Sequence, residues 1–151
     1  MIDIAMYITG FPELEGAYGN LYRKFYPPEY DGSFTVDSED LASAHIKFEG
    51  GLSVQLEVSF ASHVEEEIVL TEIYGTKGGA SRRNEKVRFF STNGEGSYVE
   101  TVTDYTIKTQ SSQAHFIDAI IEDKPVPITA AQGAQVVRVM DAIYASSGII
   151  Y

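Results

Sequence analysis

Apolar and polar residues alternate through the middle of the chain. In residues 40–62 one apolar set precedes Gly50-Gly51 and another follows it: Ala42, Ala44, Ile46 and Phe48, then Leu52, Val54, Leu56, Val58 and Phe60. A period of two on both sides of a turn is typical of an antiparallel hairpin with one apolar face. The opposite face carries Ser43, His45, Lys47, Ser53, Gln55, Glu57 and Ser59. Few of these residues are charged, so we expect something to cover this polar face.

More strands are predicted downstream. Residues 65–83 favour a strand, a Gly-rich turn and the start of another strand, and residues 86–103 favour two strands around Asn93-Gly94, a common hairpin-turn pair. Residues 26–33, which are rich in Pro, Gly and Asp, favour a loop. We therefore predict a sheet of at least five strands, mostly antiparallel.

The last third changes to the 3.6-residue period of a helix. Residues 111–124 place Phe116, Ile117, Ile120 and Ile121 on one face, with Ser111 or Ser112 as the cap. Residues 129–148 open with Thr129 and Gln132 at capping-box spacing, align Val136, Val137, Met140, Ile143 and Tyr144, and close at Gly148. We expect both helices to cover the apolar face of the sheet.

The first residues also predict a helix, but one without a capping residue. Ile4, Tyr7 and Ile8 have the spacing of one buried face, and Gly10 and Pro12 suit the end of a helix. No Ser, Thr or Asn precedes the first apolar residue, although the first turn has N–H groups that need a partner. The pattern raises the question of what precedes Met1. The order of elements predicts an α+β fold, with an open antiparallel sheet and helices on one face, as a single domain over residues 1–151.

Composition and charge exclude several classes of partner. The 151 residues are 44% hydrophobic, enough for an ordinary core, and the formal charge is -11. Such a negative field repels phosphate backbones and anionic lipid, so we expect no nucleic acid and no membrane as partners. The absence of cysteine excludes disulfides and thiolate metal sites and agrees with a reducing compartment, so we expect a cytoplasmic protein.

Few residues are candidates for chemistry. The Gly-rich segment 75–79 lacks Walker spacing, which favours a plain turn over a phosphate cradle. His63 before the acidic run 65–67 suggests either a weak metal site or, as we favour, a solvated strand edge. His115 lies beside an apolar stripe, which favours a packing role, and Ser53 and Ser59 lack the sharp turn that a hydrolase nucleophile needs. Asp3 fits a helix-dipole residue or a functional one, and no metal site is assigned.

Four segments in chain order resemble successive parts of a known family. They are "IDIAMYITGFPELEGAYG", "DLASAHIKFEGG", "VSFAS…EIYGTKGG" and "HFIDAIIEDKPVPITAAQGAQVVRVMDAIYASSG". The chain resembles the C-terminal domain of the glucose-fructose oxidoreductase, inositol dehydrogenase and MocA (Gfo/Idh/MocA) family. The resemblance covers nearly the whole chain and is strongest in "EIYGTKGG" and "DAIYASSG".

The resemblance implies a two-domain parent. In this family an N-terminal Rossmann domain binds NAD or NADP, and the second domain completes the substrate pocket and forms the oligomer through its open sheet. The helix that matches residues 1–9 follows an Asp-x-x-x-His motif, and a later aspartate matches Asp3. The His then falls immediately before Met1, and the family's catalytic lysine lies in the absent domain. The resemblance thus implies a chain truncated within its active-site motif.

The implied reaction is hydride transfer between a sugar, polyol or similar small substrate and a nicotinamide cofactor, with the absent His exchanging the hydroxyl proton. Asp3 is the substrate-binding residue that carries over, either accepting a hydrogen bond from a substrate hydroxyl or orienting that His. No catalytic or cofactor-binding residue is assigned, and we predict that the chain alone is inactive and holds no cofactor. The alternative is a self-standing, non-catalytic carbohydrate-binding or scaffold module. The uncapped first helix favours the enzyme domain.

Overall fold

A computed structural model describes residues 1–24, 38–84, 86–92, 97–102 and 110–148. These residues belong to two compact units, one within Met1–His63 and His115–Tyr151 and the other within Val64–Ala114. Within the described residues, no helix is both long enough and apolar enough to cross a membrane. The loop predicted at residues 26–33 and the Asn93-Gly94 turn lie outside the described residues.

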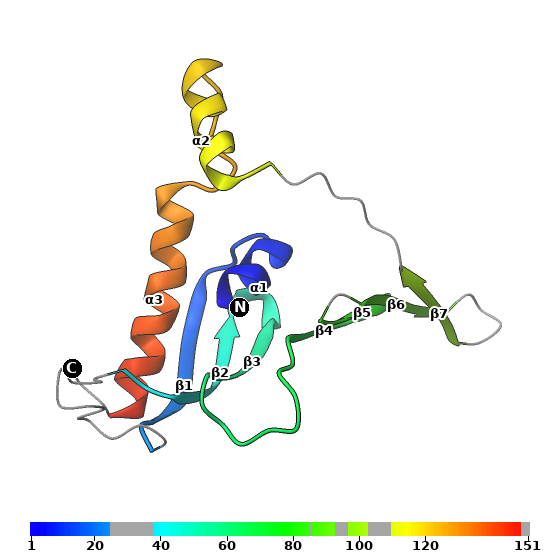
Figure 1. The fold of residues 1–151 in the computed structure, drawn as a ribbon, viewed down its shortest axis with the longest axis vertical. Helices are drawn as coiled ribbons and strands as arrows, with labels where there is room; N and C mark the ends of the chain where they lie inside the picture. The colour runs from blue at the N-terminus through cyan, green and yellow to red at the C-terminus, as the bar shows by residue number, and fades with distance from the viewer. Residues whose placement is uncertain (25–37, 85, 93–96, 103–109, 149–151) are drawn as a thin grey trace. The chain divides into compact units, whose positions relative to one another are not determined.

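The first unit contains a three-stranded antiparallel sheet in the order β1 (Leu14–Tyr22), β2 (Leu41–Phe48) and β3 (Ser53–Ser59) (Figure 1). The β2–β3 hairpin is confirmed, and a short 3-10 turn, η1 (Glu49–Gly51), joins its strands. Gly50 and Gly51 have φ values of 74° and 81°, in the left-handed region that glycine enters without steric cost. The two glycines therefore close the hairpin.

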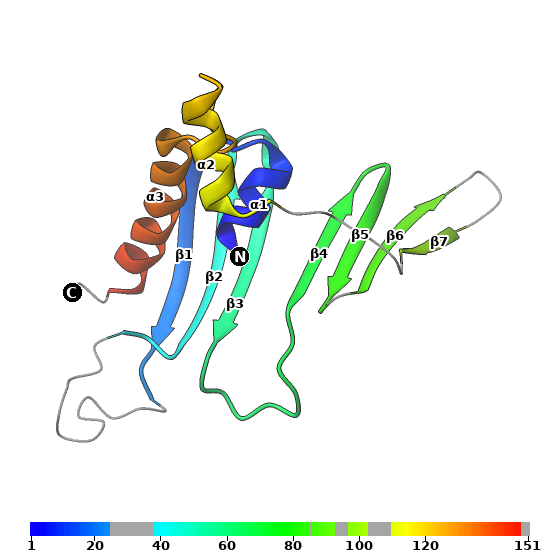
Figure 2. The ribbon, with the colours of Figure 1, turned by 45° about the horizontal axis from the view of Figure 1, so that its top comes forward.

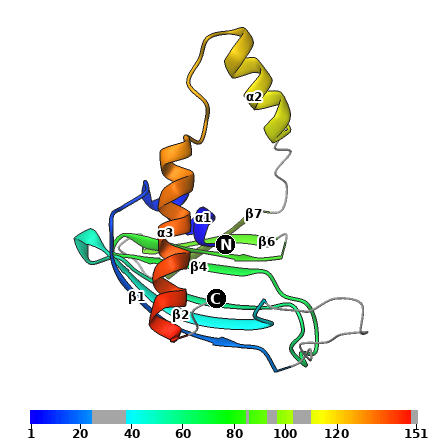
Figure 3. The ribbon, with the colours of Figure 1, turned by 90° about the vertical axis from the view of Figure 1, so that its left-hand side faces the viewer.

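Register places the apolar and polar residues on opposite faces, as predicted. Ala44 pairs with Leu56 and Ile46 with Val54, while His45 pairs with Gln55 on the other face. The helices α1 (Ile2–Thr9) and α3 (Ala130–Ser147) pack on the apolar face, and α3 lies along β1 (Figures 1 and 3). The core is the buried set that joins these elements: Met6, Leu21, Ala42, Ile46, Phe48, Val139 and Ile143. An α+β fold with helices on one sheet face is thus confirmed.

The buried face of α1 differs from the prediction. Met6 is buried and Ile2 packs against the core, whereas Tyr7 and Ile8 are 64% and 52% exposed. A helix can be apolar on more than one face, and the sheet and α3 cover the face that carries Ile2 and Met6. The predicted helix end is confirmed, because Gly10 adopts the left-handed conformation and Phe11 N–H donates to the Met6 carbonyl at 2.7 Å.

The second helix also differs from the prediction. α2 (Ser112–Ile121) forms where expected, and Ser111 Oγ accepts a hydrogen bond from the Ala114 N–H at 3.1 Å, which identifies Ser111 as the cap. The apolar stripe nevertheless does not cover the sheet: Phe116, Ile117, Ile120 and Ile121 are 59%, 52%, 65% and 75% exposed. The 3.6-residue period specifies which residues share a face, but not which element packs against it.

The last helix matches its predicted ends. The Thr129 hydroxyl accepts the Gln132 N–H, and the Gln132 side chain accepts the Thr129 N–H, which completes a capping box. Gly148 closes α3 in the left-handed conformation. Ile143 of the predicted stripe is buried, but Val137 is 54% exposed and Val139, which the prediction omitted, is fully buried, so the face that packs is shifted from the predicted stripe. These local signals therefore set the ends of α3 correctly.

The second unit is a four-stranded antiparallel sheet (Figure 2). Its strands follow the chain in order: β4 (Leu70–Gly75), β5 (Gly78–Arg83), β6 (Lys86–Thr92) and β7 (Ser97–Val102). Gly75 pairs with Gly78, so the Gly-rich segment is the tight turn that the sequence predicts. All strand pairs of the described residues are antiparallel. They form two sheets, of three and four strands, so the prediction of one sheet with at least five strands is wrong.

Candidate functional site

The first unit contains a cavity of about 290 Å³ between α1, the three-stranded sheet and α3. Most of its wall is apolar: Met1, Ile2, Leu21, Ala42, Leu56, Val58, Val136, Met140 and Ile143. Three residues add polar side chains to this wall, namely Asp3, Glu39 and Tyr144. Its volume is at the lower end of the ~300–1,000 Å³ typical of small-molecule sites, which also combine apolar walls with a few polar groups. The cavity is our candidate site.

Asp3 lies in the first turn of α1 and lines this cavity. Its carboxylate is 2.8 Å from the α-amino group of Met1 and is 66% exposed. The hydrogen bond from that amino group lowers the pKa of the Asp3 carboxyl, with a smaller contribution from the Ile4 N–H, while partial burial opposes both. One carboxylate oxygen, Oδ1, thus already accepts a hydrogen bond from the Met1 amino group. The expectation that Ile8 packs inward behind it is wrong, because Ile8 is exposed.

Glu39 and Tyr144 form a second polar group of the cavity. The Tyr144 hydroxyl lies 2.7 Å from both Oε1 and Oε2 of Glu39 and donates to this carboxylate. Tyr144 comes from α3 and Glu39 from the segment before β2, so the bond joins positions 105 residues apart. Sequence reasoning missed the pair, because Tyr144 counts as one member of an apolar helical stripe. The only available signal was a phenol in that stripe, since buried tyrosine hydroxyls find partners.

Asp40 follows Glu39 and is only 2% exposed. Its Oδ2 accepts a hydrogen bond from the Lys24 N–H at 2.7 Å, and its own N–H donates to the Tyr22 carbonyl at 2.9 Å. Its carbonyl oxygen accepts from the Ser59 hydroxyl at 2.8 Å. Asp40 thus holds the end of β1 and the end of β3 together and fixes the backbone next to Glu39. This residue, too, was not found from the sequence.

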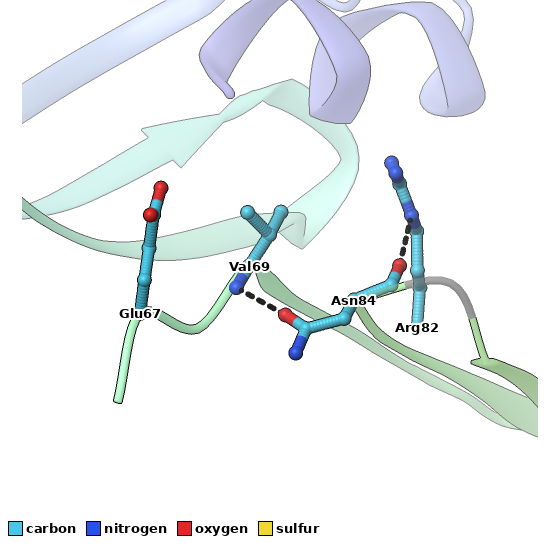
Figure 4. Close-up of a pocket in the computed structure, with 4 residues that line it drawn as sticks. All are labelled: Glu67, Val69, Arg82 and Asn84. Carbon is cyan, nitrogen blue, oxygen red and sulfur yellow. Dashed lines mark hydrogen bonds between the residues drawn. The ribbon is translucent and has the colours of Figure 1, made fainter. Parts of the chain in front are cut away.

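The second unit has a surface hollow of about 330 Å³ lined by Glu67, Val69, Arg82 and Asn84 (Figure 4). Asn84 Oδ1 accepts the Val69 N–H at 2.9 Å, and Arg82 Nε donates to the Asn84 carbonyl at 3.0 Å. Asn84 has a φ of 53° at the β5–β6 turn, a conformation that asparagine tolerates. These contacts close the end of a hairpin, so we interpret the hollow as part of the turn.

The remaining sequence candidates do not converge on a site. Among the described residues, no three His, Asp or Glu side chains form a group suited to a metal ion. In the acidic run after His63, Glu66 pairs with Arg83 at 3.0 Å. His115 is exposed on α2, so the expected packing role is wrong. Its helix does not bring it into the core.

The two serines belong to the sheet. Ser53 pairs with Lys47 across the β2–β3 ladder. The Ser59 hydroxyl donates to the Asp40 carbonyl and lies 2.5 Å from the Ser62 hydroxyl. Ser59 therefore contributes to the end of β3 and is not placed at a strand-to-helix elbow.

The chain is similar in sequence to a known protein family. Residues 1–148 match a family model described as the C-terminal alpha/beta domain of an oxidoreductase family. The D-glucoside 3-dehydrogenase of Escherichia coli (strain K12) is 28% identical, over 97% of this chain and 44% of its own length.

Solved structures show the same fold. Levoglucosan dehydrogenase, in complex with NADH and levoglucosan, has a TM-score of 0.78 at 22% identity, over 97% of this chain and 45% of that chain. The UDP-N-acetylglucosamine 3-dehydrogenase of Acidithiobacillus ferrooxidans has a TM-score of 0.72 at 19% identity, over 98% of this chain and 47% of that chain. The chain therefore spans a little less than half the length of these relatives.

Proposed function

Because the chain belongs to the Gfo/Idh/MocA oxidoreductase family as its C-terminal α/β domain, we propose that it is the substrate-binding and oligomerisation half of an NAD(P)-dependent oxidoreductase. The substrate class that we propose is a sugar, polyol or similar small molecule. The names of a glucoside dehydrogenase and of a levoglucosan dehydrogenase among the similar proteins support this class.

One observation carries the proposal: Asp3, which the resemblance assigns to the substrate, lines an amphipathic cavity of suitable size. A pyranose or polyol has hydroxyl groups that donate hydrogen bonds and C–H faces that pack on apolar side chains. The ionised Asp3 carboxylate can accept from a hydroxyl, and the apolar wall can pack against the ring. In this proposal Asp3 binds and orients the substrate.

We assign the binding of the nicotinamide cofactor to a domain outside this chain. The 151-residue sequence contains no G-x-G-x-x-G segment, and the glycines of residues 75–79 form a hairpin turn in the second unit. The residues present therefore do not fit a dinucleotide. We propose that an N-terminal Rossmann domain of the parent binds NAD or NADP, and that the chain alone is inactive.

We also propose that the polar face of the β1–β2–β3 sheet is the surface of a homo-oligomer. The helices α1 and α3 occupy the other face. On the polar face, His45 and Gln55 are exposed, and so is Tyr18, which pairs with His45. An exposed tyrosine amid polar and few charged residues is typical of a protein interface.

Sugar binding by the isolated chain tests the proposed function. We expect D-glucose to perturb the NMR signals of a saturable set of residues with only millimolar affinity, because in this proposal the N-terminal domain of the parent completes the pocket. Ethanol at equal molarity serves as the control for unspecific effects of a hydroxyl group. A chain whose spectrum responds equally to ethanol and glucose, or to neither, would contradict a substrate-binding role.

A further inference from the structure

The Glu39 and Tyr144 side chains form a polar group in the candidate cavity that the family resemblance does not assign. The phenol donates to the carboxylate at 2.7 Å from each of its oxygens. A carboxylate has about four acceptor sites, and one phenol proton occupies at most two of them. Glu39 therefore keeps the capacity to accept a hydrogen bond from a ligand in the cavity.

The position of Glu39 is fixed from two sides. The neighbouring Asp40 is buried and is bonded to the ends of β1 and β3. Tyr144 holds the carboxylate from α3, and Val136, Met140 and Ile143 of the same helix line the wall beside it. A group held in this way loses little conformational freedom on binding, which favours a selective contact.

Charge sets the kind of ligand that the cavity accepts. Its ionisable side chains, Asp3 and Glu39, are both acidic, but Asp3 pairs with the α-amino group of Met1 at 2.8 Å, whereas Glu39 forms no ion pair among the described residues. The Glu39 carboxylate therefore accepts hydrogen bonds from hydroxyl groups and repels a carboxylate or phosphate on the ligand. The apolar wall suits the C–H face of a ring.

We propose that Glu39 is a specificity-determining residue that accepts a hydroxyl hydrogen bond from a neutral sugar and disfavours anionic sugars. Tyr144 is a positioning residue, because it acts through Glu39. The inference rests on the proposed function. It deepens that function by naming which members of the substrate class the cavity selects, namely uncharged, polyhydroxylated rings.

The experiment titrates the isolated chain with D-glucose and, separately, with D-glucuronate, which carries a carboxylate at neutral pH. Methyl NMR signals of Val136, Met140 and Ile143 report on the cavity wall. In the wild-type chain we expect glucose to shift these signals and glucuronate to bind about tenfold more weakly or not at all.

Two variants separate the two roles. Glu39→Gln removes the charge and keeps the size, so glucose affinity falls several-fold and the preference for glucose over glucuronate disappears. Tyr144→Phe removes the hydroxyl but keeps the charge, so glucose affinity falls several-fold while glucuronate stays disfavoured. Glu49→Gln removes the same charge from the exposed β2–β3 turn and is expected to change neither value. Circular dichroism verifies that each variant is folded.

Three other outcomes would each contradict a specific part of the proposal. Glucose binding at the cavity with unaltered affinity and preference in both variants would refute the roles of Glu39 and Tyr144. Glucose shifts confined to residues outside the cavity would refute the location and leave the proposed sugar-binding function standing. A spectrum that responds to neither sugar would overturn the proposed function and this inference together.

Discussion

At the scale of single residues, the segment of Glu39 and Asp40 connects the sheet with α3. Asp40 is buried and bonds backbone groups at the ends of β1 and β3, whereas Glu39 accepts the Tyr144 hydroxyl in the cavity. A buried carboxylate is tolerated only when hydrogen bonds offset the loss of hydration. The two adjacent acidic residues thus have separate roles, one in the stability of the sheet and one in the candidate site.

Replacing Asp40 by Ala is expected to lower the free energy of unfolding by about 2 to 3 kcal/mol, because the Lys24 N–H loses a charged acceptor. Asp40→Asn keeps an acceptor and should cost less, about 1 kcal/mol. Urea denaturation measures both values. Glu49→Ala, at an exposed turn, is the control and should remain within about 0.5 kcal/mol of wild type. Equal losses for Asp40→Ala and the control would refute this role.

Asp3→Asn tests the residue that the resemblance assigns to the substrate. In a protein that joins this chain to a nicotinamide-binding half, we expect kcat/KM to fall by about one to two decades, or roughly 1 to 3 kcal/mol. The reason is the loss of a charged acceptor in the wall of the cavity. Thermal unfolding should barely change, because the Asp3 side chain is 66% exposed. Unaltered kinetics would identify Asp3 as a helix-dipole residue only.

At the scale of elements, the first unit depends on the close approach of α3 to β1. A Cβ added at Gly19 would lie 2.7 Å from Ile143 Cγ2 and 3.1 Å from the Ser43 carbonyl oxygen. The Gly19 N–H also donates to the Ser146 hydroxyl of α3 at 2.8 Å. Glycine is therefore needed here for space, and this contact sets how closely the helix packs on the sheet that forms the cavity floor.

Gly19→Ala is expected to destabilise the first unit by about 1 to 3 kcal/mol through overpacking against Ile143. Gly16→Ala, in the same strand, is a matched control, because a Cβ there meets nothing within 4 Å. That variant should be neutral or stabilising by up to about 1 kcal/mol, since it reduces the freedom of the unfolded chain. Thermal or urea unfolding of the two variants side by side measures the difference. Equal stabilities would mean that α3 does not approach β1 so closely.

At the scale of the whole molecule, the chain combines a helix-covered sheet face with an open one. The region that matches covers 44–47% of the length of the similar proteins named above. The exposed apolar stripe of α2 and the exposed Tyr7 and Ile8 of α1 add further apolar surface to the first unit. Exposed apolar patches mark interaction sites, so these residues are further candidates for a binding surface of the first unit.

The oligomer prediction concerns the polar sheet face. We expect a homodimer or larger assembly at tens of micromolar, with at least ~1,000 Å² buried between subunits. Gln55→Arg places a bulky charge on the β3 strand of this face and should shift the assembly toward monomer in light scattering. A wild-type monomer would contradict the oligomer. An unaffected Gln55→Arg oligomer would place the interface on another surface.

The cofactor prediction concerns the chain as a whole. We expect no saturable binding of NADH or NADPH to the isolated chain in isothermal titration calorimetry, because its sequence lacks a glycine-rich loop that leads into a helix N-terminus. Micromolar binding of either dinucleotide would contradict the assignment of the cofactor to another domain.

The sequence by itself determined the features that depend on near neighbours in the chain. The capping box of Thr129 and Gln132, the helix end at Gly10 and the β2–β3 register all follow from contacts within a few residues or across one tight turn. Turn chemistry and backbone hydrogen bonds fix such features locally, so the α+β class and the element order were predictable.

Only the tertiary structure decided which apolar faces are covered. The predicted stripes of α1 and α2 are both largely exposed, as at Ile8 and Ile120, whereas Met6, outside the predicted α1 stripe, is buried. Burial depends on an element that arrives from far along the chain, and periodicity contains no information on that partner. The candidate cavity could not be predicted for the same reason. Asp3, Glu39 and Tyr144 line one cavity only because α1 and α3 pack on the same sheet.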